Sequence, residues 1–123
     1  MARVTALVPD LLFGSRVLAL LQHGGHEVEL ISSEPEAWDQ IAGTDVLVVD
    51  LTSDELDGVM LVDTLRSGGE LHSVRTLGVY AHVDVDTRRR AVEAGFDLVV
   101  PRSRMVREGA ELVGQLAEAE RRA

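Results

Sequence analysis

The segment "DVLVVDLTSDELDG" (residues 45–58) passes from an apolar run directly into a run of acidic residues. Residues 46–49 contain no polar side chain, which is typical of a strand whose two faces are both covered by other elements. Asp50 then places a carboxylate at the end of this strand. A carboxylate in that position can cap a helix, hold a metal ion or receive a phosphoryl group. The segment therefore predicts a strand buried in a sheet and a candidate site at its end.

Composition narrows the class of protein. The chain has 123 residues, of which 46% are hydrophobic and 27% charged, and we expect one globular domain over residues 1–123. The net charge of −9 repels phosphate backbones and anionic lipids, so we expect neither nucleic acid nor membrane as a partner. The absence of cysteine excludes disulfides and thiol chemistry. No apolar run has the length of a membrane span, and a cytoplasmic location is expected.

Short β-branched runs alternate with amphipathic segments along the whole chain. Strands are predicted over 3–8, 27–31, 45–50, 76–80 and 97–100, and helices over 12–23, 35–43, 58–66, 84–95 and 103–121. Such alternation predicts a parallel sheet with right-handed crossovers and helices on both faces. The predicted fold class is α/β, a three-layer sandwich with five parallel strands and five helices. If the strand order is 2-1-3-4-5, as in a flavodoxin-like fold, the first and third strands are neighbours.

Two carboxylates follow neighbouring strands of this predicted sheet. Asp10 comes after the first strand and Asp50 ends the third. Ligand sites of parallel sheets lie beyond the carboxyl ends of the strands, so we expect Asp10 and Asp50 to face each other at that edge. Neither a G-x-G-x-x-G motif nor a phosphate-binding G-x-x-x-x-G-K-[ST] motif occurs in the chain.

The spacing of these residues resembles the receiver domain of bacterial response regulators. Asp50 is followed seven residues later by Asp57-Gly58, and Ala94-Gly95 lies ahead of the fifth strand. The resemblance implies that Asp50 is the phosphoacceptor and that Asp10, Asp50 and the backbone carbonyl of Thr52 could hold Mg²⁺. It also implies a stand-alone signalling protein, not an enzyme, that works by binding other proteins. Asp57 is expected to cap the following helix.

The chain departs from the receiver pattern at three positions. Pro9 stands where receivers carry a second metal-binding acid, and Tyr80 stands where they carry a Ser or Thr that responds to phosphorylation. The conserved receiver Lys aligns with Arg102 in an ungapped match and with Val100 if one gap is allowed, and the sequence does not decide between them. These departures favour a degenerate receiver with impaired phosphoryl switching. The alternatives are a working Mg²⁺-dependent phosphoacceptor at Asp50 and a small-molecule-binding flavodoxin-like module.

The resemblance also indicates a surface for partners. In receivers the face formed by the fourth helix, fifth strand and fifth helix contacts other proteins or a second copy. Here that face is expected to be basic, and its residues are Arg88, Arg89, Val99, Arg104 and Arg107. We expect a kinase or an effector protein as partner, and a homodimer is a further candidate.

Two expectations concern charge and histidines. With only Pro9 in place of the second acid, and with the cation in doubt, Asp10 and Asp50 should repel each other, so Asp50→Asn should raise the melting temperature. The pair His23 and His26 flanks two glycines, which favours a helix end and a turn over a metal site. His82 follows the fourth strand, where an exposed loop residue is favoured over a bond to Asp50.

Overall fold

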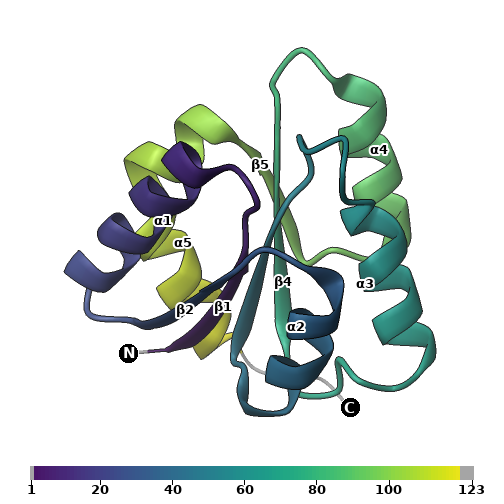
Figure 1. Ribbon diagram of the computed structural model, residues 1–123, viewed down its shortest axis with the longest axis horizontal. Coiled ribbons are helices and arrows are strands. Elements are labelled where there is room, and N and C mark those ends of the chain that lie inside the picture. Colours follow the sequence, from purple (N-terminus) through teal and green to yellow (C-terminus); the bar gives the residue numbers. More distant parts are fainter. Residues whose placement is uncertain (1, 120–123) are drawn as a thin grey trace.

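The computed structural model describes residues 2–119, which form a parallel sheet between two layers of helices (Figure 1). The strands are β1 (Arg3–Leu7), β2 (Glu27–Ile31), β3 (Val46–Asp50), β4 (Arg75–Tyr80) and β5 (Leu98–Pro101). The helices are α1 (Leu11–His23), α2 (Glu34–Gln40), the short 3-10 helix η1 (Ile41–Gly43), α3 (Gly58–Ser67), α4 (Val85–Ala94) and α5 (Arg102–Glu118).

The strand order is β2-β1-β3-β4-β5, and every pairing is parallel. Helices α1 and α5 cover one face of the sheet, and α2, α3 and α4 cover the other (Figure 1). This arrangement confirms the flavodoxin-like α/β fold and the strand order predicted from the sequence.

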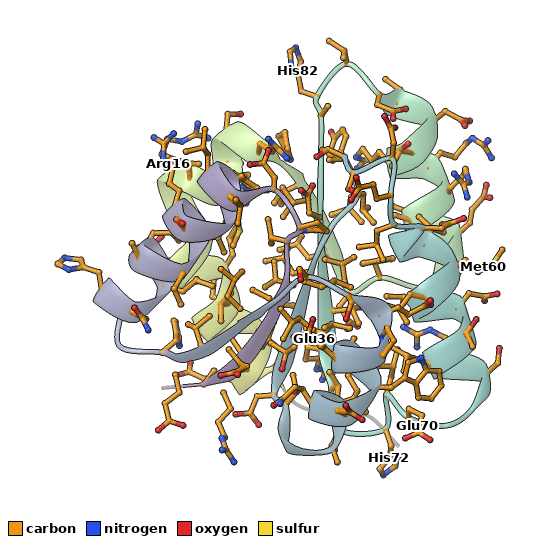
Figure 2. The ribbon with its side chains drawn as sticks, viewed as in Figure 1. Arg16, Glu36, Met60, Glu70, His72 and His82 are labelled. Carbon is orange, nitrogen blue, oxygen red and sulfur yellow. The ribbon has the colours of Figure 1, made fainter. Side chains whose placement is uncertain are left out.

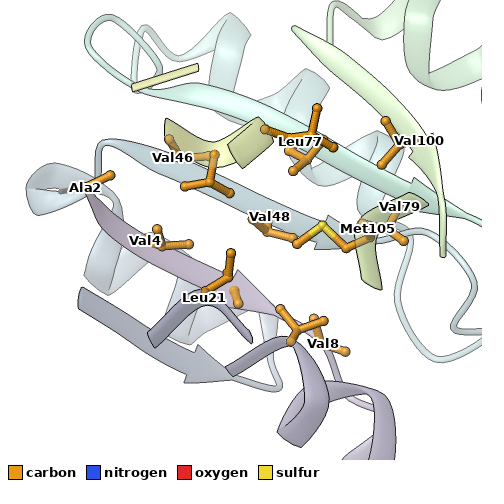
Figure 3. Close-up of a cluster of buried hydrophobic side chains, with 14 of the residues drawn as sticks. Ala2, Val4, Val8, Leu21, Val46, Val48, Leu77, Val79, Val100 and Met105 are labelled. Carbon is orange, nitrogen blue, oxygen red and sulfur yellow. The ribbon is translucent and has the colours of Figure 1, made fainter. Parts of the chain in front are cut away.

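The strand β3 lies at the centre of the sheet and is buried along its whole length. Val46 and Val48 pack into the core beneath α1 and α5, which Figure 3 shows. Leu47 and Val49 point the other way, into the core beneath α2, α3 and α4. The strand needs apolar residues at successive positions because both of its faces are covered, as its sequence predicted.

The helices bury one apolar stripe each. In α1 the stripe includes Val17 and Leu21, and in α5 it includes Met105 and Val113, all of which are fully buried. The longest helix, α5, has 17 residues. Within residues 2–119, no helix combines the length and the apolar character needed to cross a bilayer.

The predicted boundaries differ from the observed ones mostly by one residue, and the difference matters at α5. This helix begins at Arg102, not at residue 103, because Pro101 ends β5 in an extended conformation and acts as its N-cap. Arg102 thereby leaves the strand end and enters the first helical turn. Residues 120 and 121 of the predicted helix lie outside the described residues. The predicted helix over 35–43 is divided into α2 and η1.

Three helices begin at an aspartate on the carboxyl edge of the sheet. Asp10 accepts hydrogen bonds from two amides of α1, Asp57 accepts one from the Met60 amide of α3, and Asp84 accepts one from the Thr87 amide of α4. These bonds satisfy amides that have no partner within the helix and place negative charge at the positive end of the helix dipole. The expected capping role of Asp57 is confirmed.

The histidine pair does not gather a metal site. His23 ends α1 and is exposed, followed by the capping Gly24, as the glycines predicted. The Nδ1 of His26 accepts from the Ala2 amide at 3.1 Å, and its Nε2 faces the Ala110 carbonyl oxygen at 3.0 Å. A carbonyl only accepts, so Nε2 carries the proton. His26 therefore ties the start of β1 to α5. No group of three or more metal-ligating side chains occurs in the part of the chain that the structure describes.

Replacing His26 with alanine removes both of these bonds and leaves the part-buried Ala2 amide without this acceptor, whereas the Ala110 carbonyl lies within α5 and keeps its helical partner. We expect His26→Ala to lower the free energy of unfolding by about 1–3 kcal/mol in urea denaturation. His23→Ala is the matched control, and its exposed side chain should change the stability by less than about 0.5 kcal/mol. Equal effects of the two substitutions would contradict a tethering role for His26.

The cap of α4 makes a prediction about pH. Hydrogen bonds from the Thr87 side chain and from its backbone amide lower the pKa of Asp84. A carboxylate with a lowered folded pKa stabilises the fold above its unfolded pKa, and that contribution is lost as the pH falls through the folded pKa. Thr87→Val should move the pKa of Asp84 upward in a carboxyl-carbon NMR titration. Thr87→Ser, which keeps the hydroxyl, should leave it unchanged, and a similar rise in both variants would refute the cause.

Candidate functional site

Asp50 is the last residue of β3, and its side chain is fully buried. Its Oδ1 accepts two hydrogen bonds from Thr52, one from the amide at 3.0 Å and one from the hydroxyl at 2.7 Å. Such bonds from a residue two positions later are typical of aspartate at the start of a turn. They fix the carboxylate and leave Oδ2 directed at the neighbouring helix α5.

The guanidinium of Arg102 meets this second oxygen. Its Nη2 donates to Asp50 Oδ2 at 2.9 Å and to the Thr52 hydroxyl at 2.6 Å. The same nitrogen lies 3.7 Å from Asp10 Oδ2. Thr52 thus accepts from Arg102 and donates to Asp50, which closes a ring of polar contacts around one buried carboxylate.

Of the two residues that the sequence offered as the cation position, only Arg102 contacts Asp50. Arg102 supplies the cation at the site, although it belongs to the first turn of α5 and not to β5. Val100 is fully buried in the core beneath α1 and α5. The Arg102 guanidinium also lies over the ring of Phe13, 4.1 Å from its centroid, in a cation–π contact.

Asp10 lies where the strand order predicts, beside Asp50 at the carboxyl edge of the sheet. Its Oδ1 accepts from the amides of Leu12 and Phe13 at 3.0 and 3.1 Å, so this oxygen is committed to the cap of α1. Its Oδ2 faces Arg102. The expected repulsion between the two carboxylates is wrong in its premise, because the guanidinium lies between them and compensates both charges.

The donor set does not fit Mg²⁺ as the sequence anticipated. Magnesium prefers six oxygen ligands at about 2.0–2.1 Å in an octahedron. Both oxygens of Asp50 already have partners, one oxygen of Asp10 caps α1, and Pro9 has no side-chain ligand to offer. The Thr52 hydroxyl is turned toward Arg102 and Asp50. A metal ion would have to displace the guanidinium to reach Asp50 Oδ2.

An open crevice of about 370 Å³ lies in front of these residues. Its lining consists of Pro9, Asp10, Asp50, Thr52, Ser53, Asp54, Glu55 and Arg102. The crevice is strongly acidic at its rim, and Arg102 is the only cation in this lining. The crevice therefore brings together four residues that the sequence predicted for the site, namely Asp10, Asp50, Thr52 and Arg102.

Tyr80 is also near the carboxyl edge, at the end of β4, and its side chain is buried with 9% exposure. It lies opposite Pro101 in the β4–β5 register. The hydroxyl that bonds Asp50 belongs to Thr52 instead. His82 is exposed, and Figure 2 shows it on the loop after β4 with its ring directed away from the molecule. The favoured interpretation of His82 as a loop residue is confirmed.

Three of the four arginines on the expected basic face have acidic partners. Arg89 pairs with Asp86 at 2.6 Å and Glu93 at 3.1 Å, and its hydrogen bonds to these two acids raise the pKa of Arg89. Arg104 and Arg107 both contact Glu108, at 3.5 and 3.1 Å. The prediction of an unusually basic patch was wrong because these acids recur three or four residues away on the same helices, or next in the chain.

The remaining two members of that face differ from one another. Arg88 is exposed, whereas Val99 is partly buried against the core beneath α2, α3 and α4. The sequence reasoning missed two features of the site, the Thr52 hydroxyl and the Phe13 ring. The Asp-x-Thr spacing of Asp50 and Thr52 could have indicated the first, since an aspartate commonly bonds the residue two positions on.

Comparison with known proteins bears on the fold. No protein-family model and no curated protein matches the chain. Many solved structures do. The receiver domain of the Francisella response regulator 1452 is 18% identical, with a TM-score of 0.83 over 96% of this chain and 98% of that one. A response regulator from Thermotoga maritima is 20% identical, with a TM-score of 0.80 over 97% and 99%.

A third structure, the BeF3-activated DrrB receiver domain, is 15% identical, with a TM-score of 0.81 over 97% of this chain and 99% of that one. The chain has the receiver fold. Within this receiver fold, Asp50 lies at the end of the central strand, where the resemblance in sequence placed the phosphoacceptor. At these identities the likeness establishes the fold alone.

Asp50→Asn should destabilise the protein, the reverse of what repulsion predicts. The asparagine side chain can be placed in two ways. If its NH2 group faces the Arg102 guanidinium, two donors meet. If its oxygen faces Arg102, the NH2 group faces Thr52, which then loses its acceptor. We expect the free energy of unfolding to fall by about 1–3 kcal/mol at neutral pH, near the lower end because the Arg102 side chain is 35% exposed.

Asp54→Asn is the matched control, because Asp54 is an exposed acid of the same crevice. Its effect in thermal or urea melts should be below about 0.5 kcal/mol. An Asp50→Asn protein that melts higher than wild type would restore the repulsion hypothesis and contradict a stabilising role for the Arg102 contact.

Proposed function

We propose that this chain is a receiver-type signalling protein that acts by binding a partner protein and does not switch through a phosphoryl group on Asp50. The observation that carries the proposal is the 2.9 Å bond from Arg102 to Asp50 Oδ2. Phosphorylation attaches the phosphoryl group to a carboxylate oxygen, and here one oxygen is held by Arg102 and the other by Thr52. The attacking group is therefore occupied and buried.

Two departures from the receiver pattern support the same conclusion. Catalysis of phosphoryl transfer depends on positioning and on neutralising charge, for which metal ions are the usual means. Pro9 offers no second metal-binding carboxylate beside Asp10. Tyr80 is buried at the strand end where receivers carry a short hydroxyl side chain, so a small movement toward a phosphoryl group is not available to it.

Protein binding is proposed as the mode of action because exposed apolar residues lie at the starts of α1 and α4, on the carboxyl edge of the sheet. Leu11 and Leu12 begin α1 and are 85% and 87% exposed. Val83 and Val85 flank the start of α4 and are also exposed. The α4–β5–α5 face with Arg88, predicted from the resemblance, is a second proposed surface. The partner is proposed to be a kinase or effector protein or a second copy, and the net charge of −9 disfavours nucleic acid and membranes.

A working phosphoacceptor remains the second proposal, because one observation favours it. Asp50 lies at a crevice of about 370 Å³ and is accompanied by a cation that could neutralise an incoming phosphoryl group. Displacement of Arg102 from Asp50 Oδ2 onto the phosphoryl oxygens would free the nucleophile. The two proposals differ in whether Asp50 is modified at all.

Treatment with Mg²⁺ and a small phosphodonor such as acetyl phosphate separates them. We expect intact-mass spectrometry to find no acid-stable, base-labile acyl phosphate on the wild-type protein, as on Asp50→Ala. Labelling of wild type that is absent from Asp50→Ala would overturn the proposed function and support the phosphoacceptor.

The second arm of the experiment concerns the partner. Proteins cross-linked to the wild-type chain in its own cells should be recovered with Asp50→Ala in the same amounts, within about twofold. A set of partners that depends on Asp50 would contradict signalling without phosphorylation. Recovery of no partner protein with either the wild type or Asp50→Ala would contradict protein binding itself.

A further inference from the structure

We propose that the Arg102 guanidinium is the resident cation of the crevice, and that it keeps divalent metal ions out of the space between Asp10 and Asp50. The proposal rests on the proposed function and adds to it the cation that the site uses. Removal of the Arg102 charge should accordingly create a divalent-cation site that the wild-type protein lacks.

One nitrogen atom of Arg102 lies close to side-chain oxygens of three residues. Nη2 of Arg102 lies 2.9 Å from Asp50 Oδ2, 2.6 Å from Thr52 Oγ1 and 3.7 Å from Asp10 Oδ2. The two carboxylate oxygens are the ones that a metal ion between Asp10 and Asp50 would use. A guanidinium is not deprotonated in proteins, so its charge is permanent across the working pH range. The carboxylates therefore have a counter-charge without any metal.

The second step concerns what holds the guanidinium in place. It is fixed at its base by the first turn of α5 and lies over Phe13, with Cζ 4.1 Å from the ring centroid. Phe13 is in turn fixed by α1, whose cap Asp10 accepts the Phe13 amide. The planar group can bond and stack at once, which a lysine ammonium on a flexible chain cannot. Asp10 thus orients the aromatic surface as well as contributing charge.

The third step is the competition between the two cations. Mg²⁺ loses part of its hydration shell to bind and usually needs one or two carboxylates together with waters. In wild type it would first have to break the bonds of Arg102 to Asp50 and Thr52, and then leave a guanidinium next to a divalent ion. With a neutral residue at 102, Asp50 Oδ2 and Asp10 Oδ2 are unpaired and converge, so the same oxygens become metal ligands.

The test compares metal binding by the wild-type chain, Arg102→Gln and Arg107→Gln. The control Arg107→Gln makes the same change in net charge at an exposed arginine that pairs with Glu108. Mn²⁺ serves as probe, because it prefers oxygen ligands and broadens nearby NMR signals, and Mg²⁺ is titrated by calorimetry. We expect Arg102→Gln to bind at least about tenfold more tightly than wild type, with broadening centred on the Asp50 and Thr52 amides.

Each outcome bears on the proposal. Site-specific broadening of Asp50 and Thr52 in wild type, as strong as in Arg102→Gln, would overturn it, and so would an equal gain in Arg107→Gln. In an Arg102→Gln, Asp50→Asn double variant the gain should disappear. If Arg102→Gln fails to fold, Phe13→Leu weakens the seat of the guanidinium without altering any ligand, and its metal affinity should exceed that of wild type.

The failure of this inference is distinguishable from failure of the proposed function. Wild-type protein that binds metal but remains unlabelled by phosphodonor would refute Arg102 as the resident cation and leave signalling without phosphorylation intact. Wild-type protein that becomes labelled on Asp50 without binding metal would refute the proposed function and leave the resident cation intact.

Discussion

A carboxylate buried at the end of the central strand needs a counter-charge, and the residues at the carboxyl edge of the sheet provide it. Asp50 follows four buried apolar residues of β3, with helices packed on both faces of the strand. An isolated charge in such surroundings costs several kcal/mol unless it is paired and hydrogen-bonded. Thr52 supplies the hydrogen bonds from the following loop, and Arg102 supplies the charge from α5.

The compensation comes from one side of the sheet. Arg102 and Phe13 belong to α5 and α1, which share a layer, while α3 and α4 in the opposite layer contribute no charge to Asp50 among the described contacts. A rearrangement of Asp50 would therefore first displace side chains of α1 and α5. The exposed Leu11 and Leu12 begin one of these two helices, so a protein bound there would contact the layer that also holds the counter-charge.

The sequence predicted the large features because each has a strong local signal. The continuous apolar run of β3 and the alternation of strands and helices predicted a parallel sheet covered on both faces, and the resemblance to receivers implied the strand order. The positions of Asp10 and Asp50 at strand ends placed them at one edge. The identity of the cation could not be predicted, because it depends on a one-residue shift in the start of α5 and on the reach of a long side chain. Alignment by spacing treats Val100 and Arg102 as alternatives. In the folded chain Val100 is buried in the core, and Arg102 reaches Asp50.

The prediction of a basic partner face failed for a related physical reason. Counting arginines on α4 and α5 ignores where their own helices place acids, and Glu108 or Glu93 lies within one turn of each paired arginine. The Phe13 ring was missed because its role depends on Arg102, whereas the bond from the Thr52 hydroxyl to Asp50 was open to prediction from their spacing. Once that guanidinium is placed, its contact with the ring follows from its size and planarity.

The three helices α1, α3 and α4 share a pattern of ends with a consequence for the whole molecule. Each begins at an aspartate, namely Asp10, Asp57 and Asp84, and each ends at a glycine, namely Gly24, Gly68 and Gly95. The ends at the carboxyl edge of the sheet are thus capped by carboxylates, and the opposite ends by glycine amides that bond helix carbonyls. Acid and salt weaken carboxylate caps but leave glycine ends unaffected. The starts of these three helices therefore respond to pH and ionic strength, whereas their glycine ends do not.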